Sequence, residues 1–182
     1  IEIYTLQHAM QLLQNNLDAF GNARLFINSI PAYILNNNDF EKIRSKYEDL
    51  LNRIIIEFTE QTEVSDANLS NIQRRCRENN MGLAIDDYGT GYSNMQRVSK
   101  LPLKIIKIDK SLVDDMHTPD GSSIMKNTIR MMRDIRKELV AEGVETKEDL
   151  DELTGMGVDF IQGLLFLKAS ACRRICFFLK GA

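Results

Sequence analysis

Polar side chains follow six short apolar runs in this sequence, each at the point where a strand would meet its loop. In chain order they are Asn28, Glu57, Asp86, Lys107, Glu142 and Gln162. Asp87 directly follows Asp86, and Asp109 lies two residues beyond Lys107. Carboxylates gathered in one place repel one another, and Mg²⁺ or Mn²⁺, which prefer oxygen ligands, would compensate their charge. Two such ions can clamp the attacking and leaving oxygens of a phosphoryl centre, so the pattern favours metal-assisted phosphoryl chemistry.

Each acid taken alone has a more ordinary interpretation. A single acid after a strand is commonly a helix N-cap or a solvated loop residue. Six polar strand ends in succession weaken that interpretation. The Asp86-Asp87 pair is the sharpest element, because two adjacent acids after an apolar strand are costly unless they are capped or metal-bound. The glycines of Gly89-Thr90-Gly91 allow a tight loop after the pair, although such a loop is a weak signal alone.

The apolar runs that precede these residues alternate with helical patterns. The runs are Ala23–Ile27, Arg53–Ile56, Met81–Ile85, Leu103–Ile108, Lys137–Ala141 and Val158–Ile161. Continuous apolar runs separated by helices indicate buried parallel strands. Active sites of parallel barrels lie at the carboxyl ends of the strands, so the six polar ends are expected to converge.

Helical spacing and capping signals support the same alternation. Ile1–Asn15 is predicted to be helical, as is Asp66–Asn79 with Ser65 as its N-cap. Thr146 with Asp149 predicts a capping box for a helix that Gly155 or Gly157 ends. Four residues at a spacing of four, three and four indicate one face of another helix: Ile124, Thr128, Met131 and Ile135.

Repeated strand–helix alternation predicts an α/β fold, either a doubly wound open sheet or a (β/α)8 barrel. A barrel normally takes about 250 residues and eight units. The chain has 182 residues and six visible units, and it begins on a helix. If the fold is a barrel, we expect an N-terminal piece to be missing from this chain.

Composition excludes several classes of protein. The net charge of −3, from 23 basic and 26 acidic residues, argues against a protein that wraps a nucleic-acid duplex. No apolar run approaches a membrane span and no export signal is visible. Three cysteines form no disulfide or zinc framework, which indicates a reduced, cytoplasmic compartment. Two histidines, His8 and His117, nearly exclude histidine-based triads, and His117 is expected to be exposed in a loop. Arg74, Arg75 and Arg77 are expected to form a solvated helix face.

Several motifs together resemble one family, the EAL domains, which are bacterial cyclic-di-GMP phosphodiesterases of signalling pathways. Ile85–Ser93 resembles the family's DDFGTGYS loop, Leu101–Ser111 resembles LPVDxIKIDRSF, and Val140–Thr146 is VAEGVET. Shorter matches are Phe26–Ser29 to VNxS, Glu57–Glu60 to ExTE, and Gln162-Gly163 to the QG near the end. The resemblance covers about residues 1 to 170, and so many motifs in register are highly specific.

The resemblance implies a modified (β/α)8, TIM-like barrel that hydrolyses cyclic-di-GMP to linear pGpG with two Mg²⁺ or Mn²⁺ ions. It implies metal ligation by Asn28, Glu57, Asp86, Asp87 and Glu142, with Asp86 bridging the two ions. It implies catalytic roles for Lys107, Glu142 and Glu57, with Lys107 orienting the attacking water or stabilising developing charge. Substrate and loop roles fall to Gln162, Glu60, Gly89, Thr90, Gly91 and Ser93.

The match departs from the family at both ends. No Glu-Ala-Leu sequence, the motif that names the family and supplies a metal ligand, occurs in residues 1–182. Leu164–Ala169 stands where the family has YxFSKP. We therefore expect residues 1–182 to be a single EAL-type domain that is incomplete at its N-terminus, with this chain alone weakly active or inactive. Unpaired strand edges would favour self-association as a homodimer or larger assembly.

Two alternatives remain open at this point. The absent Glu-Ala-Leu segment also fits a non-catalytic domain that binds cyclic-di-GMP or a partner protein. Without reference to a family, strand-end carboxylates with a lysine base also fit a metal-dependent enolising barrel. That enzyme would take a carbon acid as its substrate and cleave no phosphodiester.

Overall fold

The computed structural model describes residues 2–28, 36–59, 65–90, 98–99 and 101–163. These residues fall into two compact units, Ile1–Leu83 and Ala84–Ala182, called here the first and the second unit. The helices are α1 Glu2–Asn15, α2 Leu17–Phe20, α3 Asn37–Tyr47, the 3₁₀ helix η2 Glu48–Arg53, α4 Asp66–Glu78, α6 Lys110–Asp115, α7 Pro119–Asp134 and α8 Lys147–Met156. The strands are β1 Leu25–Asn28, β2 Ile54–Thr59, β3 Gly82–Tyr88, β4 Ile105–Ile108, β5 Glu138–Ala141 and β6 Phe160–Ile161. No described helix is long and apolar enough to cross a membrane.

All six predicted strands are present, and each begins one or two residues later than its apolar run. In the first unit β1 pairs with β2 in parallel, and in the second unit β3, β4, β5 and β6 pair in that order, also in parallel. The strand residues are almost completely buried, as continuous apolar runs require. The prediction of parallel strands alternating with helices is therefore confirmed.

The first unit holds β1 and β2 against the helices α1, α3 and η2. The side chain of Arg53, at the start of β2, donates from Nε to the carbonyl oxygen of Ala23 at 2.8 Å, just before β1. This bond fixes the entry of both strands. Side chains of α1, α3 and η2 supply fully buried core residues: Met10, Leu13, Ile43 and Leu51.

Ser65 caps α4 as predicted, accepting a hydrogen bond from the amide of Asn68 at 3.3 Å. The prediction that Arg75 is solvated is wrong, because only 7% of it is exposed. Its guanidinium lies 4.8 Å from the ring centroid of Phe40 and donates to Oδ1 of Asn37 at 2.8 Å. The long side chain buries its stem between α4 and α3, while Arg74 and Arg77 are exposed.

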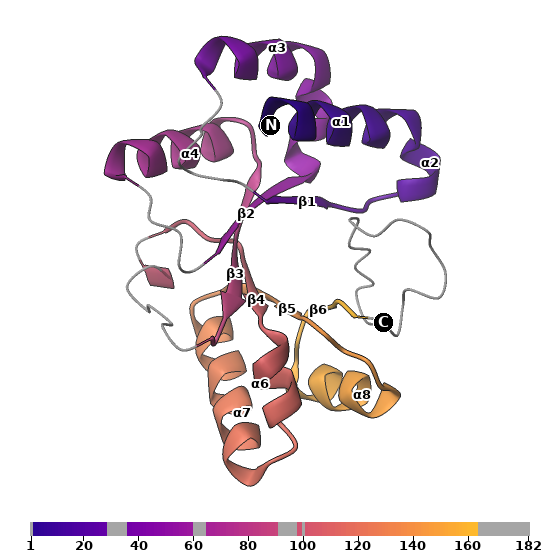
Figure 1. Ribbon diagram of the computed structural model, residues 1–182, viewed down its shortest axis with the longest axis vertical. Coiled ribbons are helices and arrows are strands. Elements are labelled where there is room, and N and C mark those ends of the chain that lie inside the picture. The colour runs from indigo at the N-terminus through magenta and orange to yellow at the C-terminus, as the bar shows by residue number, and fades with distance from the viewer. Residues whose placement is uncertain (1, 29–35, 60–64, 91–97, 100, 164–182) are drawn as a thin grey trace. The chain divides into compact units, whose positions relative to one another are not determined.

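In the second unit α6 and α7 contact each other and α7 packs against β5 (Figure 1). The capping box of α8 forms as predicted, with Thr146 and Asp149 bonding each other's backbone amides. Gly157, at φ +91°, ends that helix in the left-handed region that glycine adopts freely. Gly155 remains inside the helix.

The helix predicted around Ile124 exists as α7, and the stripe whose spacing predicted it is not its buried face. Ile124 is 53% exposed, and Ile135, just beyond the helix, is 43% exposed. The residues that face the core are Gly121, Met125, Ile129 and Met132. Gly121 is required at its position because a Cβ there would overlap the carbonyl oxygen of Asp115.

Candidate active site

Asn28 and Glu57 lie on neighbouring strands of the first unit and are register partners across β1 and β2. Asn28 is the last residue of β1, as predicted, whereas Glu57 lies inside β2, which continues to Thr59. The side chain of Asn28 is exposed, whereas Glu57 is only 3% exposed. A buried carboxylate is costly unless hydrogen bonds, a cation or a metal compensates it.

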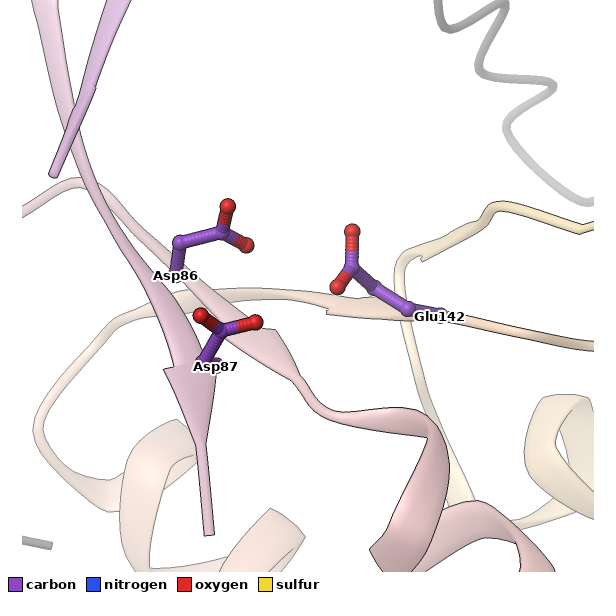
Figure 2. A group of neighbouring side chains, drawn as sticks. All are labelled: Asp86, Asp87 and Glu142. Atoms are coloured by element: carbon purple, nitrogen blue, oxygen red, sulfur yellow. The ribbon is translucent and has the colours of Figure 1, made fainter. Parts of the chain in front are cut away.

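Asp86 and Asp87 lie at the end of β3, where the strand is irregular. The pairing of β3 with β4 shifts register between Ile85 and Tyr88, and Asp87 has φ +57°, in the left-handed region. Neighbouring side chains of a regular strand point to opposite faces, whereas a bulge re-aims one of them. Figure 2 shows the result, in which both carboxylates face the same space as Glu142.

Lys107 reaches this acidic group from β4. Its Nζ atom lies 2.8 Å from Oδ1 of Asp86 and 2.6 Å from Oε1 of Glu142. The lysine side chain is 4% exposed, and the two carboxylates are 14% and 15% exposed. Charge-assisted bonds of this length in a largely water-free place fix all three side chains relative to one another.

Backbone hydrogen bonds beyond the strand ends hold these residues in place. The amide of Asp109 donates to Tyr88, that of Glu142 to Ile108, and that of Gln162 to Ala141, over 2.8–3.1 Å. The parallel ladder therefore continues one residue past each strand. Glu142 and Gln162 stand at the same edge of the sheet as the acidic pair.

Gln162 carries an acceptor that the described residues leave unpartnered. Its side-chain Oε1 atom is buried and accepts no hydrogen bond among them. A buried amide oxygen without a donor costs free energy, and a bound cation or ligand group would remove that cost. Sequence analysis predicted Gln162 at this rim, and the residue lies directly after β6.

The turn after Asp87 is held by small residues. Gly89 has φ +112°, and a Cβ there would overlap the side chain of Leu112 on α6. The hydroxyl of Thr90 donates to the carbonyl oxygen of Asp87 at 3.1 Å. Gly91, Ser93 and Glu60, for which the resemblance implies loop roles, lie outside the described residues.

Asp109 has the ordinary role that a single acid after a strand often takes. Its side chain caps α6, accepting from the amide of Ser111 at 2.9 Å and from its hydroxyl at 2.6 Å. The Nζ atom of Lys110, the next residue, lies 3.1 Å from Oε1 of Glu145, and the aliphatic part of the Lys110 side chain packs against Gly143. This contact of Lys110 was not predicted from the sequence. Gly143, the glycine directly after Glu142, could have indicated that another side chain packs closely against the backbone there.

The electrostatics of the group favour a bound cation. Burial raises the pKa of Glu142, and the negative charge of Asp86 adds to that rise while Lys107 opposes it. Burial likewise raises the pKa of Asp87, with further contributions from Asp86 and Asp109. Ligand oxygens of Asp86, Asp87 and Glu142 lie within 4.8 Å of one another. Three carboxylates and an amide oxygen suit hard divalent ions, so the residues present fit Mg²⁺ or Mn²⁺.

The fold and this group of side chains define a class, that of parallel α/β proteins with an acidic, lysine-containing site at the strand ends. The family model for the EAL domain matches residues 2–169. The chain therefore belongs to the EAL-domain family, and the modified (β/α)8 fold class that the resemblance implied is confirmed.

Named relatives carry the activity of that family. The cyclic di-GMP phosphodiesterase PA2567 of Pseudomonas aeruginosa is 35% identical over 169 residues, which is 89% of this chain but 28% of that protein. The manganese and cyclic-di-GMP complex of Klebsiella pneumoniae BlrP1 matches 98% of this chain and 47% of its own with a TM-score of 0.80 and 26% identity. The PaMucR phosphodiesterase complex with c-di-GMP matches 90% of this chain and 69% of its own, with a TM-score of 0.77 and 27% identity. The chain thus spans little more than a quarter of the length of the first of these relatives.

Proposed function

We propose that this chain is the phosphodiesterase domain of a protein that hydrolyses cyclic-di-GMP to linear pGpG with two Mg²⁺ or Mn²⁺ ions. The observation that carries the proposal is the buried contact of Lys107 with Asp86 and Glu142, beside Asp87, at the carboxyl ends of parallel strands. Named relatives of the same family are cyclic-di-GMP phosphodiesterases, which supports the choice of substrate.

The proposed ligands of the ions are Asn28, Glu57, Asp86, Asp87 and Glu142. Asp86 is the proposed bridging ligand, as the resemblance implies; it contacts Lys107, and its ligand atom lies within 4.8 Å of those of Asp87 and Glu142. Bound divalent ions would supply a hydroxide at neutral pH and neutralise charge at phosphorus. Histidine is not needed for that chemistry.

Lys107 has two tasks in this proposal. Its ammonium group holds Asp86 and Glu142 in place, and it places a positive charge where a phosphoryl oxygen gains negative charge. Gln162 offers its buried Oε1 atom to the rim of the site. Glu60 is the proposed anchor of the Asp87–Ser93 loop and takes no part in the reaction itself.

A second candidate is a domain that binds cyclic-di-GMP without hydrolysing it. Its supporting observation is that Lys107 contacts both Asp86 and Glu142, so the protein's own cation offsets part of the charge of the acidic group.

Hydrolysis of cyclic-di-GMP by this chain tests the proposal. The chain is incubated with the nucleotide and Mn²⁺, and the products are resolved by ion-exchange chromatography. We expect pGpG, abolished by Asp86→Asn and retained by Asp151→Asn, which removes an exposed acid of α8. Nucleotide binding by calorimetry without product would reject hydrolysis and establish the second candidate. Neither binding nor product would reject both.

We also propose that the protein self-associates. Large apolar side chains stand exposed in both units: Tyr4, Leu17, Ile124 and Ile135. Exposed apolar groups of this size favour contact with another protein surface. Light scattering at micromolar concentration is expected to give more than the mass of one chain, and a monomer would contradict this proposal.

A further inference from the structure

Helix α7 presents three different faces along its length. With 3.6 residues per turn, the stripe that contains Met125 and Ile129 faces the core. The partly exposed apolar stripe that contains Ile124 and Met131 lies on one flank of it. The opposite flank is basic and carries Lys126, Arg130 and Arg133, spaced by four and three residues.

The basic flank borders a hollow between α7 and α8 with a volume of about 460 Å³. Its lining includes apolar atoms of Ile129 and Met156, together with the three cations and Asp134. Gly155 leaves the α8 side open, because a Cβ there would meet no atom within 4 Å. None of these residues belongs to the acidic group at the strand ends, so the hollow is a separate feature of the second unit.

The three cations of the hollow have no ion pair or hydrogen bond within the described part of the chain. Some exposed cations on other helices are paired with acids, as Lys42 is with Asp39, Arg74 with Glu78, and Lys110 with Asp114 and Glu145. Like charges at a spacing of three or four residues on a helix destabilise it. Repulsion within this unpaired basic row therefore lowers the stability of the free protein. Binding of an anionic partner would relieve that repulsion.

Arg133 reaches from α7 to the end of α8. A Cβ at Gly157 would overlap the guanidinium of Arg133, so the glycine leaves room for that group at the end of the hollow. The planar donor fork of a guanidinium suits a carboxylate.

The geometry favours carboxylates on a peptide over a single phosphate. The donors are side chains only, since the backbone amides in the middle of α7 are already used within the helix, whereas phosphate sites typically use free helix N-termini. The cations spread over two helical turns, about 10 Å, above an apolar floor. Acidic side chains three or four residues apart on a helix would match that spacing.

We propose that the hollow between α7 and α8 docks an acidic helical segment of a partner protein. Residues 164–182 of this chain are not that segment, because they contain four basic residues and no acidic one. Lys126, Arg130 and Arg133 pair with carboxylates of the partner, and one of its apolar side chains rests on Ile129 and Met156. This docking is independent of nucleotide hydrolysis.

Fluorescence anisotropy tests the proposal with a labelled alanine-based helical peptide that carries glutamates at three positions spaced by four and three residues. Binding is expected to weaken as NaCl rises. Arg130→Gln/Arg133→Gln should weaken it about tenfold or more, an effect within the range known for interfacial charge pairs. Gly155→Leu, which fills the hollow without changing charge, should weaken it as well. Circular dichroism confirms that each variant is folded.

The matched control is Arg77→Gln/Lys104→Gln, which removes two exposed positive charges elsewhere. Equal weakening by this control would overturn the proposal, because the peptide would then respond to net charge alone. Unchanged binding in Gly155→Leu would also overturn it. Displacement of the labelled peptide by inorganic pyrophosphate would assign the hollow to phosphate ligands instead. Light scattering that shows self-association lost in the arginine variant would assign it to a second copy.

Discussion

Lys107, inside β4, contacts Glu142, one residue beyond β5, over 2.6 Å between Nζ and Oε1. Both side chains are largely buried, so this bond lies in a place of low dielectric where removal of either partner is costly. It joins adjacent strands at the point where the proposed chemistry occurs.

Lys107→Met is expected to destabilise the metal-free protein by about 3–5 kcal/mol at pH 7, because buried carboxylates then lack their cation. The pKa of Glu142 is already raised by burial, so its charged form opposes folding above its ordinary pKa of 4.5. The loss should therefore shrink as the pH falls through the raised pKa of Glu142 towards 4.5, because Glu142 then takes up a proton in the folded protein. Urea unfolding in EDTA at pH 7 and pH 4 measures it. A loss that is equal at both values would contradict this account.

Gly143→Ala is expected to destabilise the protein by more than about 1 kcal/mol, because Gly143 has φ +69° and a Cβ would overlap the stem of Lys110. Activity should fall too, since Gly143 follows Glu142 directly. Gly155→Ala is the matched control: a Cβ fits there, and stability should rise by about 0.5–1 kcal/mol. Thermal unfolding of the two variants gives the comparison, and similar melting temperatures would show that the loop after Glu142 tolerates a side chain.

Asp149 links two elements of the second unit through its contact with His117, 2.8 Å from Nε2 to Oδ1. Hydrogen bonds from Thr146 chiefly lower the pKa of Asp149, and His117 lowers it further. Because the pKa is lowered in the folded state, the carboxylate stabilises the protein above its ordinary pKa of 3.8 and loses that effect as the pH falls further. Asp149→Asn should cost about 1 kcal/mol at pH 7 and less near pH 3.

Glu152→Gln serves as the control for this prediction. Glu152 is 3.9 Å from Nδ1 of the same histidine and 39% exposed, so its removal should change stability little at either pH. The denaturation midpoints of the two variants are measured across pH 3–7. If both midpoints change with pH in the same way, the capping role of Asp149 is refuted.

Cys76 is expected to resist thiol reagents in the folded protein. Burial raises its pKa to about 12, against the lowering effect of the nearby Arg75. The thiolate is the reactive form, so almost none is present at pH 8. In a Cys172→Ser/Cys176→Ser background, Ellman's reagent should label one thiol per chain in guanidinium and react far more slowly without it. Rapid labelling of the folded chain would show that the α4 side of the first unit opens readily.

Sequence patterns predicted the elements of this protein better than their faces. All six strands were predicted because buried parallel strands are continuous apolar runs. A difference of one or two residues in where a strand begins does not hide such a run. Helical spacing predicted α7 but not which of its faces is buried, because both of its apolar stripes have that spacing. Arg75 was misplaced for a related reason, since its burial depends on Phe40, which is far away in sequence.

Within the second unit, the sequence predicted that Asp86, Asp87, Lys107 and Glu142 come together, but not how they meet. The bulge that turns Asp86 and Asp87 to one side depends on a left-handed residue that no residue type demanded. The two contacts of Lys107 depend on strand register, which only the paired strands define. An acid near a strand end does not always belong to the site, because Asp109 caps the helix α6 instead.

The bulge at Asp86 and Asp87 makes this short segment sensitive to length as well as to composition. In a regular strand one extra or one missing residue exchanges the two faces of everything that follows. Here that exchange is already built in between Ile85 and Tyr88. Over evolutionary time the segment can accept many substitutions of its apolar residues, yet a single-codon insertion or deletion would separate the two acids onto opposite sides of the sheet.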